Sequence, residues 1–239
     1  GAHGAVQGRA AQSAVVVTRK VLEDAMEAAK ARGKRIGLVT TAAVHDASPA
    51  AFSVHAKSRS DAPAIVDQYL ALEPDILLGG GRDYFLPVGT HGGRRDDGKD
   101  VLAAFAAKGY EVVQTADALR NAKDRRVLGL FADEHLDFEL DRDPAKEPST
   151  AEMAAAALRT LSADNPTGFV LFIENENIDT AGHGNDAAAL IRALWALDEA
   201  AQVRPVGGRV APVGLLLRLL ERLGDHLGRQ RGGRWTGED

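Results

Sequence analysis

Short apolar strands alternate with helical segments along this chain, and this alternation constrains the fold most strongly. IGLVTT at 36–41 and GFVLFI at 168–173 are β-branched and aliphatic runs that predict buried strands. Further strands are predicted at 75–81, 111–113 and 127–132, and helical spacing of apolar residues is found at 14–32, 49–57, 62–72, 99–108, 149–161 and 185–201. This order predicts an α/β fold, with three α/β/α layers around a largely parallel central sheet.

Composition narrows the chemistry that the chain can carry. The 239 residues are 45% hydrophobic and 26% charged, with a net charge of −5. This slightly acidic balance argues against a protein that holds nucleic acid through a basic surface. The absence of cysteine excludes disulfides, thiolate zinc sites and cysteine nucleophiles. No run approaches the roughly 20 apolar residues of a membrane span.

The two ends of the sequence differ from its middle. Residues 1–13 are expected to be poorly structured, lack the pattern of a signal peptide and begin at Gly1 rather than Met. Residues 14–202 form the predicted α/β domain. Residues 203–239 hold many Arg and Gly residues but no Lys, so we expect a tail that does not continue the fold, partly helical at 213–227. An altered reading frame is one hypothesis for this shift, which the nucleotide sequence would test.

Carboxylate and imidazole side chains follow the strand at 168–173 directly. Glu174 ends the strand, and Asp179 and His183 come next in FIENENIDTAGHGND at 172–186. Ligands of parallel sheets sit beyond the carboxyl ends of strands. Asp179 and His183 are four residues apart, so on a helical turn they share one face and suit zinc. Glu174 is placed to reach a second ion, and an ordinary solvated loop is the alternative.

A second polar stretch follows the strand at 36–41. Here Asp46 and Ser48 offer oxygen ligands, and Arg59 offers a planar fork for phosphate. The structural alternative is that Ser48 caps a helix that begins at Pro49, and that Arg59 is a surface residue. Two other stretches, the glycine-rich 77–87 and the acidic 132–143, match neither phosphate-loop nor EF-hand spacing and are interpreted as a turn and a solvated loop.

These stretches together resemble the alkaline phosphatase family, in their motifs and in their order along the chain. The resemblance rests on GKRIGLVTTAAVHDASPAAFSVHAKSR, DILLGGGRDYFLP, LGLFADEHLDFELDRDPAKEPSTAEM and GFVLFIENENIDTAGHGND, and spans residues 20–202. It implies a zinc- and magnesium-dependent enzyme that hydrolyses phosphate monoesters and binds inorganic phosphate. By position, it implies Asp179 and His183 as zinc ligands, Glu174 and Ser48 as magnesium ligands, Asp46 beside the magnesium, and Arg59 as the phosphate-binding residue.

The chain also departs from the family pattern. The Asp-Ser nucleophile motif is not found and is expected upstream of Gly1, and the later Thr-x-Asp-His signature and the final zinc histidine are not found either. Residues 175–177 are Asn-Glu-Asn where small residues and Arg are common. Asp225-His226 stands in a helical pattern and is interpreted as a coincidence. We therefore expect an incomplete domain that lacks turnover by itself.

Three origins of such a chain stay open: a fragment, a frameshifted product or a divergent paralogue. The functional alternatives are a non-catalytic metal or phosphate binder and another metal-dependent phosphomutase or sulfatase-like hydrolase. The family resemblance implies a homodimer and a periplasmic or secreted location, although this sequence shows no signal peptide. Substrate preference is not readable from the residues.

Overall fold

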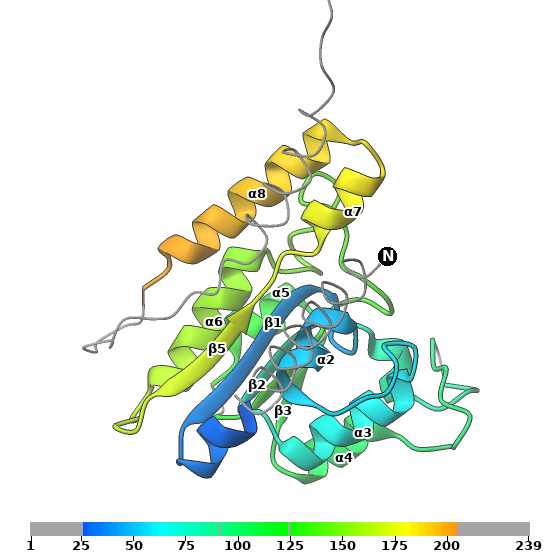
Figure 1. Ribbon diagram of the computed structural model, residues 1–239, viewed down its shortest axis with the longest axis vertical. Coiled ribbons are helices and arrows are strands. Elements are labelled where there is room, and N and C mark those ends of the chain that lie inside the picture. The colour runs from blue at the N-terminus through cyan, green and yellow to red at the C-terminus, as the bar shows by residue number, and fades with distance from the viewer. Residues whose placement is uncertain (1–25, 91, 124, 205–239) are drawn as a thin grey trace, which may run out of the picture. The chain divides into compact units, whose positions relative to one another are not determined.

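A five-stranded parallel sheet with helices on both faces forms the framework (Figure 1). The computed structural model describes residues 26–204, apart from His91 and Asp124. Its strands are β1 (Arg35–Ala43), β2 (Ile76–Gly80), β3 (Glu111–Val113), β4 (Val127–Leu130) and β5 (Phe169–Ile173). They lie in the order β3-β4-β2-β1-β5, and every neighbouring pair is parallel. The prediction of an α/β fold with a largely parallel sheet is confirmed.

Helices connect the strands in the alternating order that the sequence predicts. A helical stretch at 26–31 comes first. It is followed by α2 (Ala47–Ser53), α3 (Ala62–Leu72), the 3-10 helix η1 (Arg82–Phe85), α4 (Val101–Ala107), α5 (Ala116–Asn121), α6 (Thr150–Ser162), α7 (Asn177–His183) and α8 (Ala187–Gln202). The predicted helix at 62–72 has these bounds, and α6, predicted at 149–161, begins after a capping box formed by Ser149 and Glu152.

Each face of the sheet packs against its own hydrophobic core. Leu77 of β2 belongs to one core, whereas its neighbours Ile76 and Leu78 belong to the other, as side-chain alternation along a strand requires. Residues of α3 and α4 fill the first core, and residues of α5 and α6 fill the second. The described residues therefore form three α/β/α layers, and parallel strands buried on both sides explain the continuous apolar runs.

Three elements were not predicted, and each is short. The sequence pattern gave no element for η1 or α5, and it placed α7 in a loop or single helical turn. The start of the predicted helix 14–32 lies outside the described residues. So do the predictions for 1–13, for the helix at 213–227 and for Asp225-His226. Within the described ranges, no helix is both long and apolar enough to cross a membrane.

Candidate functional site

Glu174 lies where the carboxyl ends of β1 and β5 meet. These strands run parallel, with Val39 opposite Ile173, and the Glu174 N–H donates to the Val39 carbonyl at 2.9 Å. The Glu174 side chain is 8% exposed, and its Oε2 accepts a hydrogen bond of 2.8 Å from the Thr40 hydroxyl. The sheet thus brings together two residues that stand 134 positions apart.

The surroundings of Glu174 disfavour its negative charge. Burial raises the pKa of its carboxyl above the usual range, hydrogen bonds from Ser48 and Thr40 lower it in part, and the charges of Glu176 and Asp46 raise it further. Ser48 and Asp46 are therefore neighbours of Glu174, as the sequence predicts. A buried carboxylate close to two other acids favours a cation at this place.

Asp46, rather than Ser48, caps the helix that follows β1. The Asp46 carboxylate accepts a 2.6 Å hydrogen bond from the Ala47 N–H, and α2 begins at Ala47. The interpretation of Ser48 as a cap before Pro49 is therefore wrong, because Ser48 already lies in the first turn. Its hydroxyl is directed to Glu174 instead of to the helix end.

Arg59 reaches the same corner from the loop after α2. Its Nη2 donates to Asp46 Oδ1 at 2.5 Å, while the Arg59 side chain is 65% exposed. Arg59 is thus a surface arginine, as the structural alternative held, and it also borders the predicted site. An exposed guanidinium anchored at one nitrogen keeps further N–H groups for an oxyanion.

Asp179 and His183 form an exposed pair on α7. The His183 Nε2 and Asp179 Oδ2 atoms are 3.4 Å apart, with side-chain exposures of 82% and 68%. The helical turn that the sequence analysis considered is therefore present, and it puts both residues on one face. Imidazole nitrogen with carboxylate oxygen is a donor set that suits zinc.

The donor sets fit the two metals to different degrees. In the described part of the chain, no three His, Cys, Asp or Glu side chains converge to hold an ion. Magnesium is commonly held by one or two carboxylates and several waters, so Glu174 and Ser48 with Asp46 nearby fit it. Zinc takes four ligands, or three with an open position, and Asp179 and His183 supply two.

The sequence already places the Glu176 carboxylate near the proposed metals, but its contacts and other polar groups at this end of the sheet come from the fold. Glu176 accepts a 2.7 Å hydrogen bond from Thr180 at Oε1, and its buried Oε2 lies 3.7 Å from His135 Nδ1 without a hydrogen bond. Asn175 is buried and donates to Thr150 and to the Ala193 carbonyl. Two polar threonines end the otherwise apolar run IGLVTT, and this break in the pattern could have marked Thr40 as a site residue. Nothing local in the sequence marks His135.

The glycine-rich turn after β2 is structural, as predicted. A Cβ at Gly80 would lie 1.9 Å from the Glu134 carbonyl oxygen, and the Gly81 N–H donates to that oxygen at 2.6 Å. Three of the six acids at 132–143 pair with arginines: Asp133 with Arg82, Glu134 with Arg94, and Glu139 with Arg142. A fourth, Asp143, pairs with Lys146.

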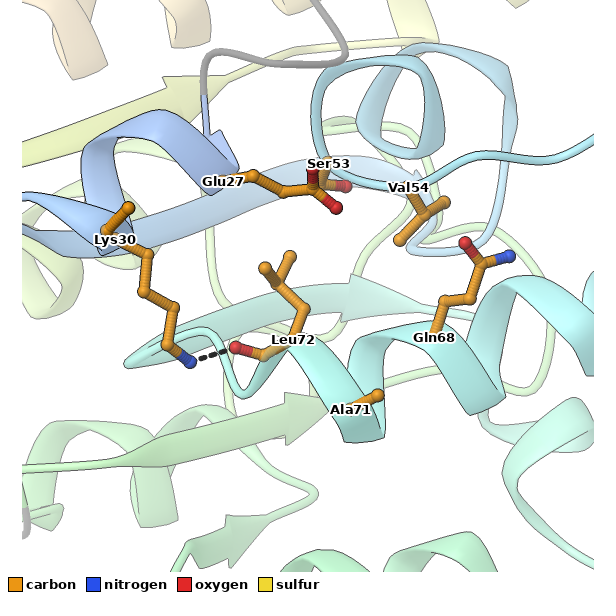
Figure 2. Close-up of a pocket in the computed structure, with 8 residues that line it drawn as sticks. Glu27, Lys30, Ser53, Val54, Gln68, Ala71 and Leu72 are labelled. Carbon is orange, nitrogen blue, oxygen red and sulfur yellow. Dashed lines mark hydrogen bonds between the residues drawn. The ribbon is translucent and has the colours of Figure 1, made fainter.

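A pocket of about 480 Å³ lies among the first helix, α2 and α3 (Figure 2). Glu27, Lys30, Ser53, Gln68 and Leu72 are among its lining residues, and none is a predicted site residue. The Lys30 ammonium donates to the carbonyls of Leu72 and Glu73, which end α3. Lys30 thus stabilises a helix end, where cations are favoured.

Comparison with known proteins identifies relatives of this arrangement. The sequence pattern described as alkaline phosphatase matches residues 4–205. The repressible alkaline phosphatase of Saccharomyces cerevisiae is 38% identical over 200 residues, which are 74% of this chain and 35% of that protein. Alkaline phosphatase 4 of Bacillus subtilis is 36% identical over 187 residues, covering 76% and 38% of the two chains.

Solved structures agree with the sequence relatives. The alkaline phosphatase of Thermus thermophilus superposes with a TM-score of 0.67 at 40% identity, covering 84% of this chain and 38% of that one. A variant of the alkaline phosphatase from the Antarctic bacterium TAB5, with Mg bound in its M3 site, gives a TM-score of 0.61 at 27% identity, with coverages of 74% and 49%. This chain thus spans half or less of the length of these relatives. It belongs to the alkaline phosphatase family.

Proposed function

We propose that this chain supplies one side of the active site of a metal-dependent phosphomonoesterase. In this proposal, Glu174 and Ser48 hold magnesium with Asp46 beside it, Asp179 and His183 hold zinc, and Arg59 binds the phosphate. Phosphate monoesters and inorganic phosphate are the proposed ligands. The family likeness also supports a homodimer and a periplasmic or secreted location as parts of the same proposal.

One observation carries the proposal: the buried Glu174 carboxylate meets the hydroxyls of Thr40 and Ser48 and the charge of Asp46. Buried carboxylates are costly unless they are paired. The donors are all oxygen atoms, which magnesium prefers. Membership of the alkaline phosphatase family supports the same assignment.

Each side chain has a separate task in this scheme. Bound metal ions supply Lewis-acid stabilisation of charge on a phosphoryl group. Arg59 offers parallel N–H groups to two phosphate oxygens and offsets the charge on them. Asp46 orients Arg59 through their ion pair, which keeps the guanidinium at the edge of the site.

We also propose that turnover needs more of a family-length polypeptide than these 239 residues. The Asp-Ser nucleophile motif and a Thr-x-Asp-His ligand segment are not found in them. Nucleophile and metal ligands act as a unit, so the loss of either costs many orders of magnitude in rate.

Phosphate binding to the zinc- and magnesium-loaded chain tests the role of Arg59. Isothermal calorimetry should show about tenfold weaker phosphate binding for Arg59→Lys, because a bidentate contact becomes a single one. Arg125→Lys is the matched control, since Arg125 is 66% exposed and pairs with Asp164 as Arg59 pairs with Asp46. Equal phosphate affinity in the wild type and both variants would contradict the proposal. Phosphate binding without hydrolysis of p-nitrophenyl phosphate by a family-length chain would favour the non-catalytic binder.

A further inference from the structure

The imidazole of His45 presents a buried nitrogen atom without a hydrogen bond. His45 follows β1 and stands directly before Asp46, and its side chain is 14% exposed. Its Nε2 has no hydrogen-bond partner among the described residues, yet it faces Asp83 Oδ1 at 3.7 Å. Since buried polar atoms are nearly always paired, this nitrogen needs an explanation beyond packing.

The surroundings of His45 hold the ring in one place. The Tyr84 ring meets it edge to face, with 5.0 Å between ring centroids and an interplanar angle of 84°. A Cβ at Gly81 would lie 2.9 Å from His45 Nε2, so the glycine leaves room for the ring. The backbone φ of Gly81 is +86°, which also favours glycine.

Asp83 is itself a fixed anchor. It is 2% exposed, its Oδ1 accepts a 2.8 Å hydrogen bond from the Tyr84 N–H, and its Oδ2 lies 3.3 Å from Arg94 Nη1. The His45 ring thus lies between the ion pair of Asp83 with Arg94 and the turn that carries Asp46.

That turn has other attachments that do not depend on the ring. The Val44 N–H donates to the Gly80 carbonyl at 3.1 Å, and the Tyr69 hydroxyl donates to the Val44 carbonyl at 2.8 Å. The Asp46 N–H donates to the Ala43 carbonyl at 2.9 Å. Loss of the ring should therefore leave the fold intact and change chiefly the orientation of Asp46.

We propose that His45, packed between Tyr84 and Asp83, is a positioning residue that fixes the Asp46 carboxylate beside the magnesium position. This inference rests on the proposed function, because it assigns a support to that site. Residues that orient the neighbours of a metal ion typically change metal affinity by about tenfold to a hundredfold when replaced.

The test compares two amides that differ in reach. Gln places its amide near the position of Nε2, whereas Asn places its amide near Nδ1. In the full chain, His45→Gln should keep magnesium affinity within about threefold of the wild type, and His45→Asn and Asp83→Asn should each lose about tenfold. His55→Gln is the control. His55 lies after the end of α2 and pairs with Glu27, so this variant should bind magnesium as the wild type does.

Amide hydrogen exchange without metal gives a second readout. His45→Asn should speed exchange at the Asp46 and Ala47 amides, while His45→Gln should leave it unchanged. Equal affinity and equal exchange in His45→Asn and the wild type would overturn the positioning role. If the wild type binds no magnesium, the proposed function fails, and the exchange comparison still decides whether His45 orders the turn.

Discussion

At the scale of single residues, contacts across the sheet decide what each polar side chain does. Asp46 takes the capping role that the local pattern gives to Ser48, because the Asp46 carboxylate reaches the Ala47 N–H and Ser48 lies in the first turn of α2. Capping preference alone accepts either residue type. The partner Glu174, distant in sequence, is what distinguishes them.

Removing each side chain should separate these roles. Asp46→Ala should lower the free energy of unfolding by about 1 kcal/mol in chelator, because α2 loses its cap. Ser48→Ala should also cost about 1 kcal/mol, because its hydroxyl hydrogen-bonds the buried Glu174, but it should leave the cap of α2 in place. Urea unfolding checks both costs, and amide hydrogen exchange should be faster at Ala47 in Asp46→Ala only; faster exchange there in Ser48→Ala would show that Ser48 is the cap.

At the scale of elements, the sequence predicts the framework well and the junctions poorly. Strands such as 111–113 and helices such as 62–72 are recovered because hydrophobic periodicity is a local property. The short helix α7 escapes prediction because Glu176 makes no side-chain cap bond at its start. The candidate site residues are proposed from the family resemblance, but the contact of Thr40 with Glu174 depends on strand pairing, which spacing cannot give.

Two glycines in different elements should respond oppositely to alanine. Gly80→Ala should destabilise the chain by about 3 kcal/mol, because the new Cβ meets a backbone oxygen that no rotamer change can move. Gly182→Ala should stabilise it by about 0.5–1 kcal/mol, since it lies within α7 and its Cβ would meet Leu190 at an ordinary 3.7 Å. Thermal unfolding checks the signs, and a destabilised Gly182→Ala would contradict the geometry of α7.

The loop before α4 should give the chain part of its acid sensitivity. The hydrogen bond from the buried Arg95 guanidinium holds the pKa of Asp97 well below its ordinary value of 3.8. A depressed folded-state pKa contributes stability above the unfolded value, and this contribution is lost as the pH falls below about 4. The free energy of unfolding of the wild type should therefore fall more between pH 5 and pH 2 than that of Asp97→Asn. Parallel pH curves for the two proteins would show that the pair contributes nothing.

At the scale of the whole molecule, the described residues form a three-layer framework, and in the proposed function they supply one side of an active site. The described residues bring Glu174, Ser48 and Asp46 together at the carboxyl end of the sheet. They also present Asp179 and His183 on an exposed helix face. The chain covers 38% of the Thermus thermophilus enzyme. We therefore expect the framework to fold within this chain, whereas turnover, under the proposed function, depends on more of the polypeptide.

This separation predicts that the purified chain folds cooperatively yet does not hydrolyse p-nitrophenyl phosphate. The assay at alkaline pH with zinc and magnesium should give the rate of buffer alone, whereas a chain extended to family length should be active. Hydrolysis by the 239-residue chain that is lost in Arg59→Ala would contradict the expected lack of turnover.

The central claim is that the buried corner around Glu174 is a magnesium site, and magnesium binding measured by isothermal calorimetry tests it most directly. The wild type should bind one magnesium ion, and Glu174→Gln should lose this binding by at least about a hundredfold, because the buried charge is removed. Glu147→Gln is the matched control, since burial also raises the pKa of Glu147 and its carboxylate accepts a backbone hydrogen bond from Asp137. Equal magnesium affinity in the wild type and Glu174→Gln would contradict the account.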